Sequence, residues 1–127
     1  MSKTVLVVDD DDAFLAELSE LLKAAGYAIV AAKDGGEAIL AMEKHKGRID
    51  GAIIDLALPE IGGFHVIGEL TKANGKNPIP LLAVTGAYKD VYLEVAEYLG
   101  ARASVRKPEP GRPLTPIVDA FNGLMAG

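Results

Sequence analysis

The sequence of 127 residues contains no cysteine and only two histidines, His45 and His65. Without cysteine, disulfides, thiolate zinc sites, iron–sulfur clusters and cysteine nucleophiles are excluded. Two histidines also leave little from which to build a histidine-rich metal site or a histidine-based hydrolase. The longest apolar runs, residues 5–8 and 79–84, are far shorter than the roughly 20 residues of a membrane helix. We therefore expect no membrane segment and no sulfur chemistry.

Positive charge is scarce as well, because 13 Lys and Arg residues against 18 Asp and Glu residues give a net charge of −5. Nucleic-acid binding usually requires a basic surface, so we expect no direct nucleic-acid partner. The first residues show neither the apolar region nor the cleavage site of a signal peptide, and we expect a cytoplasmic protein. Half of the residues are hydrophobic and 24% are charged, which predicts one globular domain over residues 1–127 rather than disorder.

Short apolar runs alternate along the chain with amphipathic stretches. The runs predict five strands, at residues 5–8, 27–32, 49–55, 79–84 and 103–106. Apolar residues at helical spacing predict five helices: from an N-cap at Asp11 or Asp12 to Gly26, about 37–46 with Asp34 as cap, from Phe64 to Asn74-Gly75, 89–99, and 114–125. Strict alternation of strand and helix indicates a parallel sheet between two layers of helices.

Five such units predict an α/β fold with a doubly wound, five-stranded parallel sheet in the flavodoxin-like order 2-1-3-4-5. An eight-stranded barrel would need roughly twice the chain. In a doubly wound sheet, ligands bind beyond the carboxyl ends of the strands, beside the first strand. The polar residues at those ends are Asp9 and Asp10, Asp55, Thr85 and Lys107. We expect their side chains to converge at one edge.

This set of side chains predicts a cation site. Three carboxylates close together are unfavourable unless positive charge joins them. Three Asp residues and Lys107 carry −3 and +1, a sum of −2, which one Mg²⁺ would neutralise. Oxygen ligands without His or Cys select Mg²⁺, Mn²⁺ or Ca²⁺ rather than zinc, and Mg²⁺ typically combines one or two carboxylates with a phosphate. Phosphoryl transfer uses all these parts, and Asp55, the central carboxylate, is the best candidate nucleophile.

Four segments resemble the signatures of bacterial response-regulator receiver domains, in order and at suitable separations. They are Val5–Asp11 (VLVVDDD), Ile53–Pro59 (IIDLALP), Leu82–Gly86 (LAVTG) and Val105–Pro108 (VRKP). The resemblance implies that Asp55 is the phosphoacceptor and receives its phosphoryl group from a phosphohistidine of a sensor histidine kinase or a phosphotransfer protein. It also implies that the protein is not an enzyme beyond catalysing its own phosphorylation and dephosphorylation.

The same resemblance implies roles for the other residues of the site. Asp10 would bind Mg²⁺ directly, Asp9 would help through water, and Ala57 would add its backbone carbonyl. Thr85 would be the switch hydroxyl, and Lys107 would bind the phosphoryl group. Pro59 and Gly63 match the loop after the phosphoacceptor strand, and the Lys107–Pro108 peptide bond is expected to be cis.

Other interpretations of these residues have specific weaknesses. Asp9 to Asp12 taken alone could be only a helix cap with an acidic first turn, although one cap needs one Asp. An aspartyl-phosphate phosphatase of the haloacid dehalogenase type needs a second Asp where this chain has Ala57. A flavin-binding module needs a Ser/Thr/Gly-rich loop after the first strand, where the Asp residues would repel a phosphate. A pseudo-receiver, acting as a phosphorylation-independent interaction module, is the remaining alternative.

The sequence departs from the family pattern at its C-terminal end. Ser104 stands where the family usually has Tyr or Phe, and Glu109 follows Lys-Pro where an apolar residue is usual. Serine is too small to fill the space that a moving switch hydroxyl would vacate. We therefore expect a small response at the fifth strand, with the loop of Gly86, Ala87 and Tyr88 carrying most of the change. Neither the downstream target nor the cognate kinase can be read from the sequence.

Overall fold

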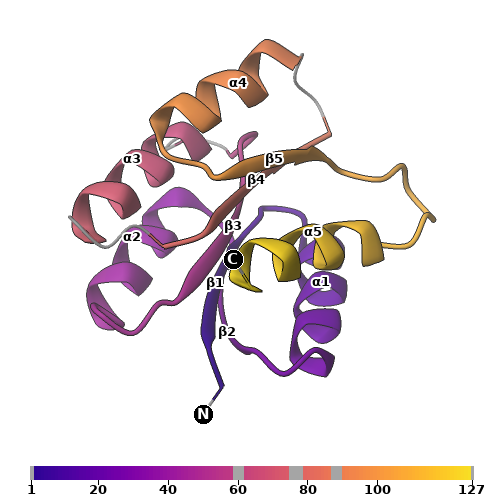
Figure 1. Ribbon diagram of the computed structural model, residues 1–127, viewed down its shortest axis with the longest axis horizontal. Coiled ribbons are helices and arrows are strands. Elements are labelled where there is room, and N and C mark those ends of the chain that lie inside the picture. The colour runs from indigo at the N-terminus through magenta and orange to yellow at the C-terminus, as the bar shows by residue number, and fades with distance from the viewer. Residues whose placement is uncertain (1, 59–61, 75–78, 87–89, 127) are drawn as a thin grey trace.

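The computed structural model describes residues 2–58, 62–74, 79–86 and 90–126, and its five strands form one parallel sheet in the order β2-β1-β3-β4-β5 (Figure 1). The predicted α/β fold and strand order are confirmed. The elements are β1 (Thr4–Val8), α1 (Asp12–Ala24), β2 (Ala28–Ala32), α2 (Gly35–Lys44), β3 (Gly51–Asp55), α3 (Gly63–Asn74), β4 (Leu81–Thr85), α4 (Asp90–Leu99), β5 (Ala103–Arg106) and α5 (Thr115–Ala126).

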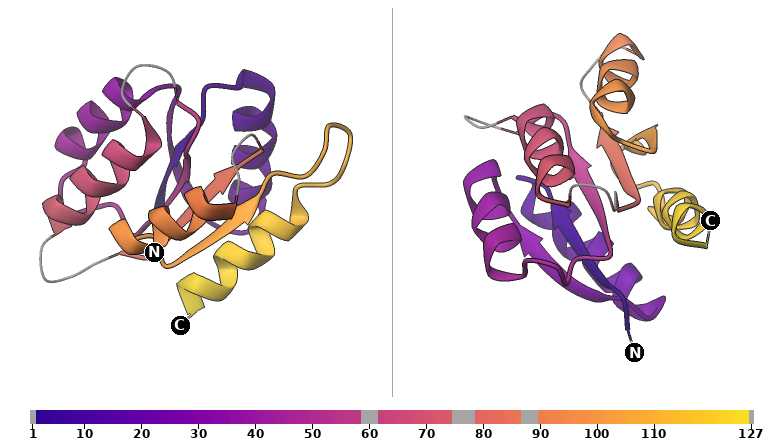
Figure 2. Two further views of the ribbon diagram at one scale, coloured as in Figure 1. Left: turned by 90° about the horizontal axis from the view of Figure 1, so that it is seen from above. Right: turned by 60° about the vertical axis from the view of Figure 1, so that its left-hand side comes forward.

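Helices cover both faces of the sheet, as the two views of Figure 2 show. Side chains alternate along β1: Val5 and Val7 belong to the apolar cluster on the face of α1 and α5, whereas Leu6 and Val8 belong to the cluster on the opposite face. These four residues are at most 1% exposed. A strand buried on both faces reads as a continuous apolar run, which is why β1 shows no alternation in the sequence.

Local chemistry sets where the elements begin. The carboxylate of Asp11 accepts hydrogen bonds from the backbone N–H groups of Ala13 and Phe14, so Asp11 is the N-cap of α1. Asp34 caps α2 as expected, but the helix begins directly after it, at Gly35. The strand β4 begins at Leu81, later than predicted, because Pro80 has no N–H to donate. The predicted boundaries at Gly75 and Lys89 lie outside the described residues.

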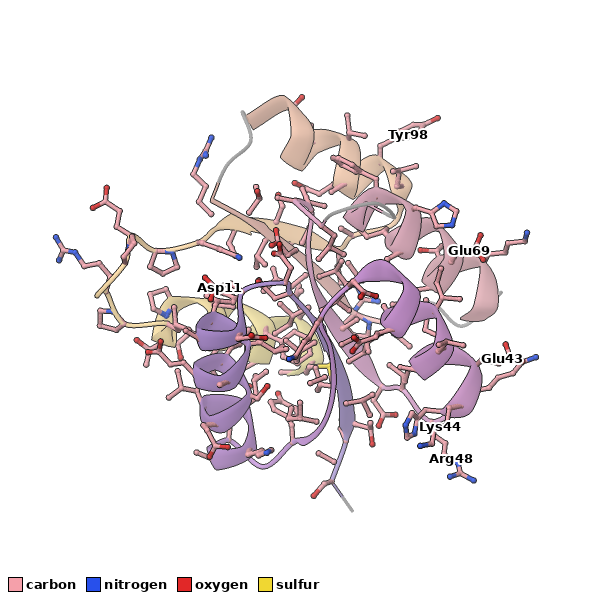
Figure 3. The ribbon with its side chains drawn as sticks, turned by 180° about the vertical axis from the view of Figure 1, so that it is seen from behind. Asp11, Glu43, Lys44, Arg48, Glu69 and Tyr98 are labelled. Atoms are coloured by element: carbon pink, nitrogen blue, oxygen red, sulfur yellow. The ribbon has the colours of Figure 1, made fainter. Side chains whose placement is uncertain are left out.

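The apolar residues of α4 are less buried than their spacing suggests. Ala96 is fully buried, whereas Val95 and Leu99 are 42% and 37% exposed. Tyr98, labelled in Figure 3, is 89% exposed on the same helix. Among the side chains of α4 that the structure describes, residues 94–99, Ala96 is the one that is fully buried. Among the described residues, no helix combines the length and the apolar character needed to cross a membrane.

Candidate functional site

The carboxyl ends of β1 and β3 bring three aspartates together. Asp9 directly follows β1, and its backbone N–H donates to the carbonyl of Ala32, which fixes the chain where it leaves the sheet. Asp55 is the last residue of β3, next to β1. One carboxylate oxygen from each of Asp9, Asp10 and Asp55 lies within 4.8 Å of the others. Asp9 and Asp55 are only 1% and 3% exposed, whereas Asp10 is exposed.

Lys107 reaches this cluster from the end of β5, the strand at the edge of the sheet. Its backbone N–H donates to the carbonyl of Thr85 at 2.9 Å, directly after β5. Its Nζ lies 2.7 Å from Oδ2 of Asp9 and 3.1 Å from Oδ2 of Asp55. Only 18% of the Lys107 side chain is exposed. The predicted convergence of Asp9, Asp10, Asp55 and Lys107 is therefore present in the structure.

The expected cis bond between Lys107 and Pro108 is wrong, because no described peptide bond is cis. The hydrogen bond to Thr85 already places the backbone of Lys107 at the edge of the sheet. From there the four-carbon side chain reaches both carboxylates with an ordinary trans bond after it. An X–Pro bond is trans by default, and the position of the ammonium gives no reason to depart from that.

Burial and charge shift the pKa values of two groups at the site. Burial raises the pKa of the Asp9 carboxyl from 3.8 to about 6, although the hydrogen bond from Lys107 opposes the shift and the negative charge of Asp55 adds to it. Burial works against the charged form of Lys107, but its contacts with Asp9 and Asp55 outweigh burial and raise the pKa of the ammonium. Lys107 stays positive, and the cluster holds more negative charge than one ammonium can balance.

The backbone around Asp55 holds its carboxylate in place. Oδ1 accepts a hydrogen bond from the N–H of Ala57 at 2.9 Å, and Oδ2 accepts one from Lys107. Gly63, the first residue of α3, packs directly on the backbone of Asp55 and Leu56, where the Cβ of any other residue would overlap the Asp55 carbonyl. The family motif includes Gly63, but only the structure shows this steric reason. Pro59 lies outside the described residues.

Two further predicted residues border the acidic cluster. Thr85 is the last residue of β4 and is fully buried beside Asp55, whose pairing partner is the preceding Val84. Ala57 is half-buried, two residues beyond Asp55. Figure 3 labels four charged residues of mixed sign, Glu43, Lys44, Arg48 and Glu69, which lie away from Asp11 at the start of α1. The acidic cluster is thus set apart from the mixed charges on and after α2 and on α3.

Sequence reasoning missed one contact of the site. The ring of Phe14, in the first turn of α1, lies under the Lys107 ammonium, with 4.2 Å between Nζ and the ring centroid. Both residues line a cavity of about 480 Å³ between the start of α1 and the loop that follows β5. Phe14 stands at helical spacing with Leu18 and Leu22 in the sequence, and it packs against the apolar cluster. Spacing alone carries no signal for its contact with a lysine 93 positions later.

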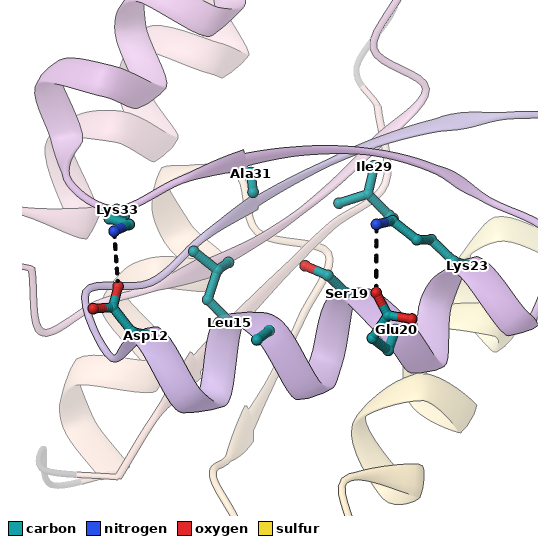
Figure 4. Close-up of a pocket in the computed structure, with 9 residues that line it drawn as sticks. Asp12, Leu15, Ser19, Glu20, Lys23, Ile29, Ala31 and Lys33 are labelled. Atoms are coloured by element: carbon teal, nitrogen blue, oxygen red, sulfur yellow. Dashed lines mark ion pairs between the residues drawn. The ribbon is translucent and has the colours of Figure 1, made fainter.

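A separate groove runs between α1 and β2 (Figure 4). Its four charged side chains are paired with one another: Lys33 with Asp12 at 3.2 Å, and Lys23 with Glu20 at 3.5 Å. These pairs neutralise the groove and leave no charge there to select a ligand. We therefore place the functional site at the acidic cluster rather than in this groove.

The comparisons with known proteins agree with this placement. The model of the response regulator receiver domain family matches residues 5–119. Response regulator GtcR of Aneurinibacillus migulanus is 34% identical over 108 residues, which cover 85% of this chain and 43% of GtcR. Protein PilH of Pseudomonas aeruginosa is 26% identical over 123 residues, which cover 97% of this chain and 98% of PilH. The chain spans less than half the length of several curated relatives that it matches.

Solved structures show the same fold. Chemotaxis protein CheY4 of Vibrio cholerae superimposes with a TM-score of 0.83 at 25% identity, over 98% of this chain and 99% of that one. A response regulator of Chloroflexus aurantiacus gives a TM-score of 0.83 at 28% identity, over the whole of both chains. The fold and the acidic edge together define a phosphoacceptor signalling module. The chain belongs to the response regulator receiver domain family, a family of two-component signalling domains.

Proposed function

We propose that Asp55 is the phosphoacceptor of this receiver domain and that residues 1–127 act as one such domain. The observation that carries the proposal is the contact between the Asp55 carboxylate and the Lys107 ammonium at 3.1 Å, beside the buried carboxylate of Asp9. Asp55 is held from one side by the N–H of Ala57 and from the other by Lys107. A carboxylate held on both sides in this way is oriented for attack on phosphorus.

In the proposed step, a carboxylate oxygen of Asp55 forms a bond to the phosphorus of a phosphohistidine on a sensor kinase or phosphotransfer protein. The phosphorus–nitrogen bond breaks, and its electron pair stays on the imidazole, which leaves and takes up a proton. Lys107 balances negative charge on the phosphoryl oxygens, and the buried hydroxyl of Thr85 donates a hydrogen bond to one of them. The exchange takes place in the cytoplasm, where the ATP that phosphorylates a kinase is available.

The residues present fit a divalent cation. Asp9, Asp10 and Asp55 offer three carboxylate oxygens within 4.8 Å of one another, with no sulfur or imidazole ligand among them. Hard oxygen donors of this kind suit Mg²⁺. We propose that Asp10, Asp55 and the carbonyl of Ala57 hold Mg²⁺ and that Asp9 assists through water. When bound, Mg²⁺ supplies positive charge for the transferring phosphoryl group.

Intact-mass measurement after incubation with Mg²⁺ and a small acyl phosphate tests this function. Wild type should gain one phosphoryl group, Asp55→Asn should gain none, and Asp119→Asn, which alters an exposed carboxylate of α5, should behave like wild type. A mass gain that persists in Asp55→Asn would refute the assignment of the acceptor. Binding of Mg²⁺ without any mass gain in wild type would instead support a phosphorylation-independent interaction module.

A further inference from the structure

Among the described residues, the Lys107 ammonium has three close partners: two carboxylates and one aromatic ring. Besides Oδ2 of Asp9 and Oδ2 of Asp55, it faces the ring of Phe14, whose centroid is 4.2 Å away. An aromatic face attracts a cation within about 6 Å of its centroid, and the attraction grows as water is removed. With 18% of its side chain exposed, Lys107 is largely shielded from water. The ring is therefore a substantial partner of the ammonium.

The ring itself is held firmly. The N–H of Phe14 donates to the N-cap carboxylate of Asp11 at 3.2 Å, which fixes the first turn of α1. The side chain is half-buried and packs against the apolar cluster that contains Leu15 and Leu114. Phe14 is thus anchored through both backbone and side chain, whereas Lys107 is a flexible four-carbon chain. The anchored ring therefore determines where the flexible Lys107 side chain places its ammonium, rather than the reverse.

We infer that Phe14 is a positioning residue for phosphoryl transfer: its ring holds the Lys107 ammonium beside Asp55. This inference rests on the proposed function, because it assigns Phe14 to the same reaction. During transfer the ammonium has to leave carboxylate oxygens and meet phosphoryl oxygens. The Phe14 ring has no formal charge. It therefore keeps the ammonium within reach of both sets of oxygens without replacing either set as the partner of its positive charge. Leucine fills much of the same space but offers no such face.

The rate of phosphorylation by a small acyl phosphate is the first readout. Phe14→Leu should lower the rate by about threefold to tenfold, the range expected for losing a partly buried cation–π contact. Phe14→Tyr keeps an aromatic face and should restore most of the rate. The matched control is Tyr98→Leu, which removes an exposed ring from α4 and should leave the rate unchanged. A small donor is used so that docking of a protein partner plays no part.

Two measurements separate positioning from a merely structural role. The affinity for Mg²⁺, measured by calorimetry, should not fall in Phe14→Leu, whereas a damaged site would lose affinity and rate together. In a Lys107→Ala background, Phe14→Leu should have no further effect on the rate, because its influence passes through the lysine. An additional loss of threefold or more in that background would overturn the inference.

Nuclear magnetic resonance gives a readout that does not depend on activity. Methylene protons of Lys107 next to Nζ should be shifted upfield by the ring, and the shift should vanish in Phe14→Leu but remain in Phe14→Tyr. If the shift is absent in wild type, or if Phe14→Leu reacts at the wild-type rate, the inference fails. Such a failure leaves Asp55 as acceptor, because only the Asp55→Asn mass experiment bears on the proposed function.

Discussion

The two halves of the sheet edge differ in how tightly they are built. On one side, β1 and β3 are buried almost throughout and end in the carboxylates of Asp9 and Asp55, which are nearly inaccessible. On the other side, β5 is only half-buried and its last residue, Arg106, is exposed. The first half matches the receiver motifs, whereas the second half keeps Lys107 but departs from the pattern at Ser104. The buried carboxylates therefore lie on the tightly packed half, and the departure lies on the more exposed half.

The departure at β5 has a visible structural counterpart. The hydroxyl of Ser104 donates a hydrogen bond to Oε2 of Glu97 at 2.7 Å, which fastens β5 to α4. In the family this position usually holds a large aromatic side chain. The hydrogen bond between Ser104 and Glu97 thus stands where the family usually has an aromatic side chain that could occupy two positions. The half of the edge formed by β1 and β3 therefore keeps the family pattern, while β5, which would pass on the signal, is built differently.

The first prediction concerns the exposed carboxylate on the half of the sheet edge formed by β1 and β3. Asp9 is tied to Lys107 and to the N–H of Asp11, whereas Asp10 is exposed and turned to the cluster of carboxylate oxygens. We expect Asp10→Ala to weaken Mg²⁺ binding by about tenfold or more, and Asp9→Ala to weaken it less. Calorimetric titration measures both, with Asp12→Ala as control, because Asp12 pairs with Lys33 instead. Equal affinities in both variants and wild type would contradict the assignment.

The second prediction concerns the close approach of α3 to Asp55. Gly63→Ala would force a methyl group into the backbone of Asp55 and Leu56, and we expect it to destabilise the fold by about 3 kcal/mol. Gly68→Ala is the matched control on the same helix, because nothing lies within 4 Å of its added Cβ. Alanine should stabilise that helix position by about 0.5 to 1 kcal/mol. Urea unfolding decides the point, and similar changes for the two glycines would show that the approach is looser than described.

A smaller effect follows from the raised pKa of Asp9, about 6 in the folded protein against 3.8 as the unperturbed value. The folded state then binds this proton more tightly, so its stabilising effect is complete below pH 3.8 and is lost as the pH rises through 6. Asp9→Asn mimics the neutral form and should stabilise the metal-free protein at pH 7.5 by about 1 to 3 kcal/mol.

Urea unfolding in the presence of a chelator, at pH 5 and at pH 7.5, measures this dependence. Wild type should gain more stability on acidification than Asp9→Asn does. The comparison between the two proteins removes the contribution of other titrating groups. If the free energy of unfolding changes equally with pH in wild type and in Asp9→Asn, folding does not raise the pKa of Asp9, and the prediction is wrong.

Most of the fold could be predicted from the sequence because buried parallel strands leave a plain apolar signature. The order 2-1-3-4-5 followed from alternation and length, and Asp55 and Lys107 fell at strand ends that the topology brings together. The errors have local causes. Pro80 lacks the N–H that would have extended β4 to Ile79, and the Asp34 cap starts α2 earlier than the apolar spacing shows.

Contacts between distant side chains could not be predicted. Helical spacing identifies Phe14 as apolar but not as the neighbour of Lys107. Likewise, Ser104 reveals an absent aromatic ring but not its hydrogen bond to Glu97. The cis bond after Lys107 was expected from the family pattern alone and is wrong, because nothing in the reach of that side chain requires it. The strand order determines which strand ends lie together, whereas side-chain packing determines the individual contacts between them.

The smallest expected effect is at β5 itself. On activation of the site, Thr85 should engage the phosphoryl group, but Ser104 is too small to fill vacated space and is fastened to Glu97. The change should therefore concentrate in the loop of Gly86, Ala87 and Tyr88, where glycine permits backbone motion; Ala87 and Tyr88 lie outside the described residues. Amide shifts with and without beryllium fluoride and Mg²⁺ measure the distribution, and shifts in 104–105 should be well below those in 86–87. Equal shifts in both segments would show that β5 transmits the signal without an aromatic residue, and uniformly absent shifts would favour a phosphorylation-independent module.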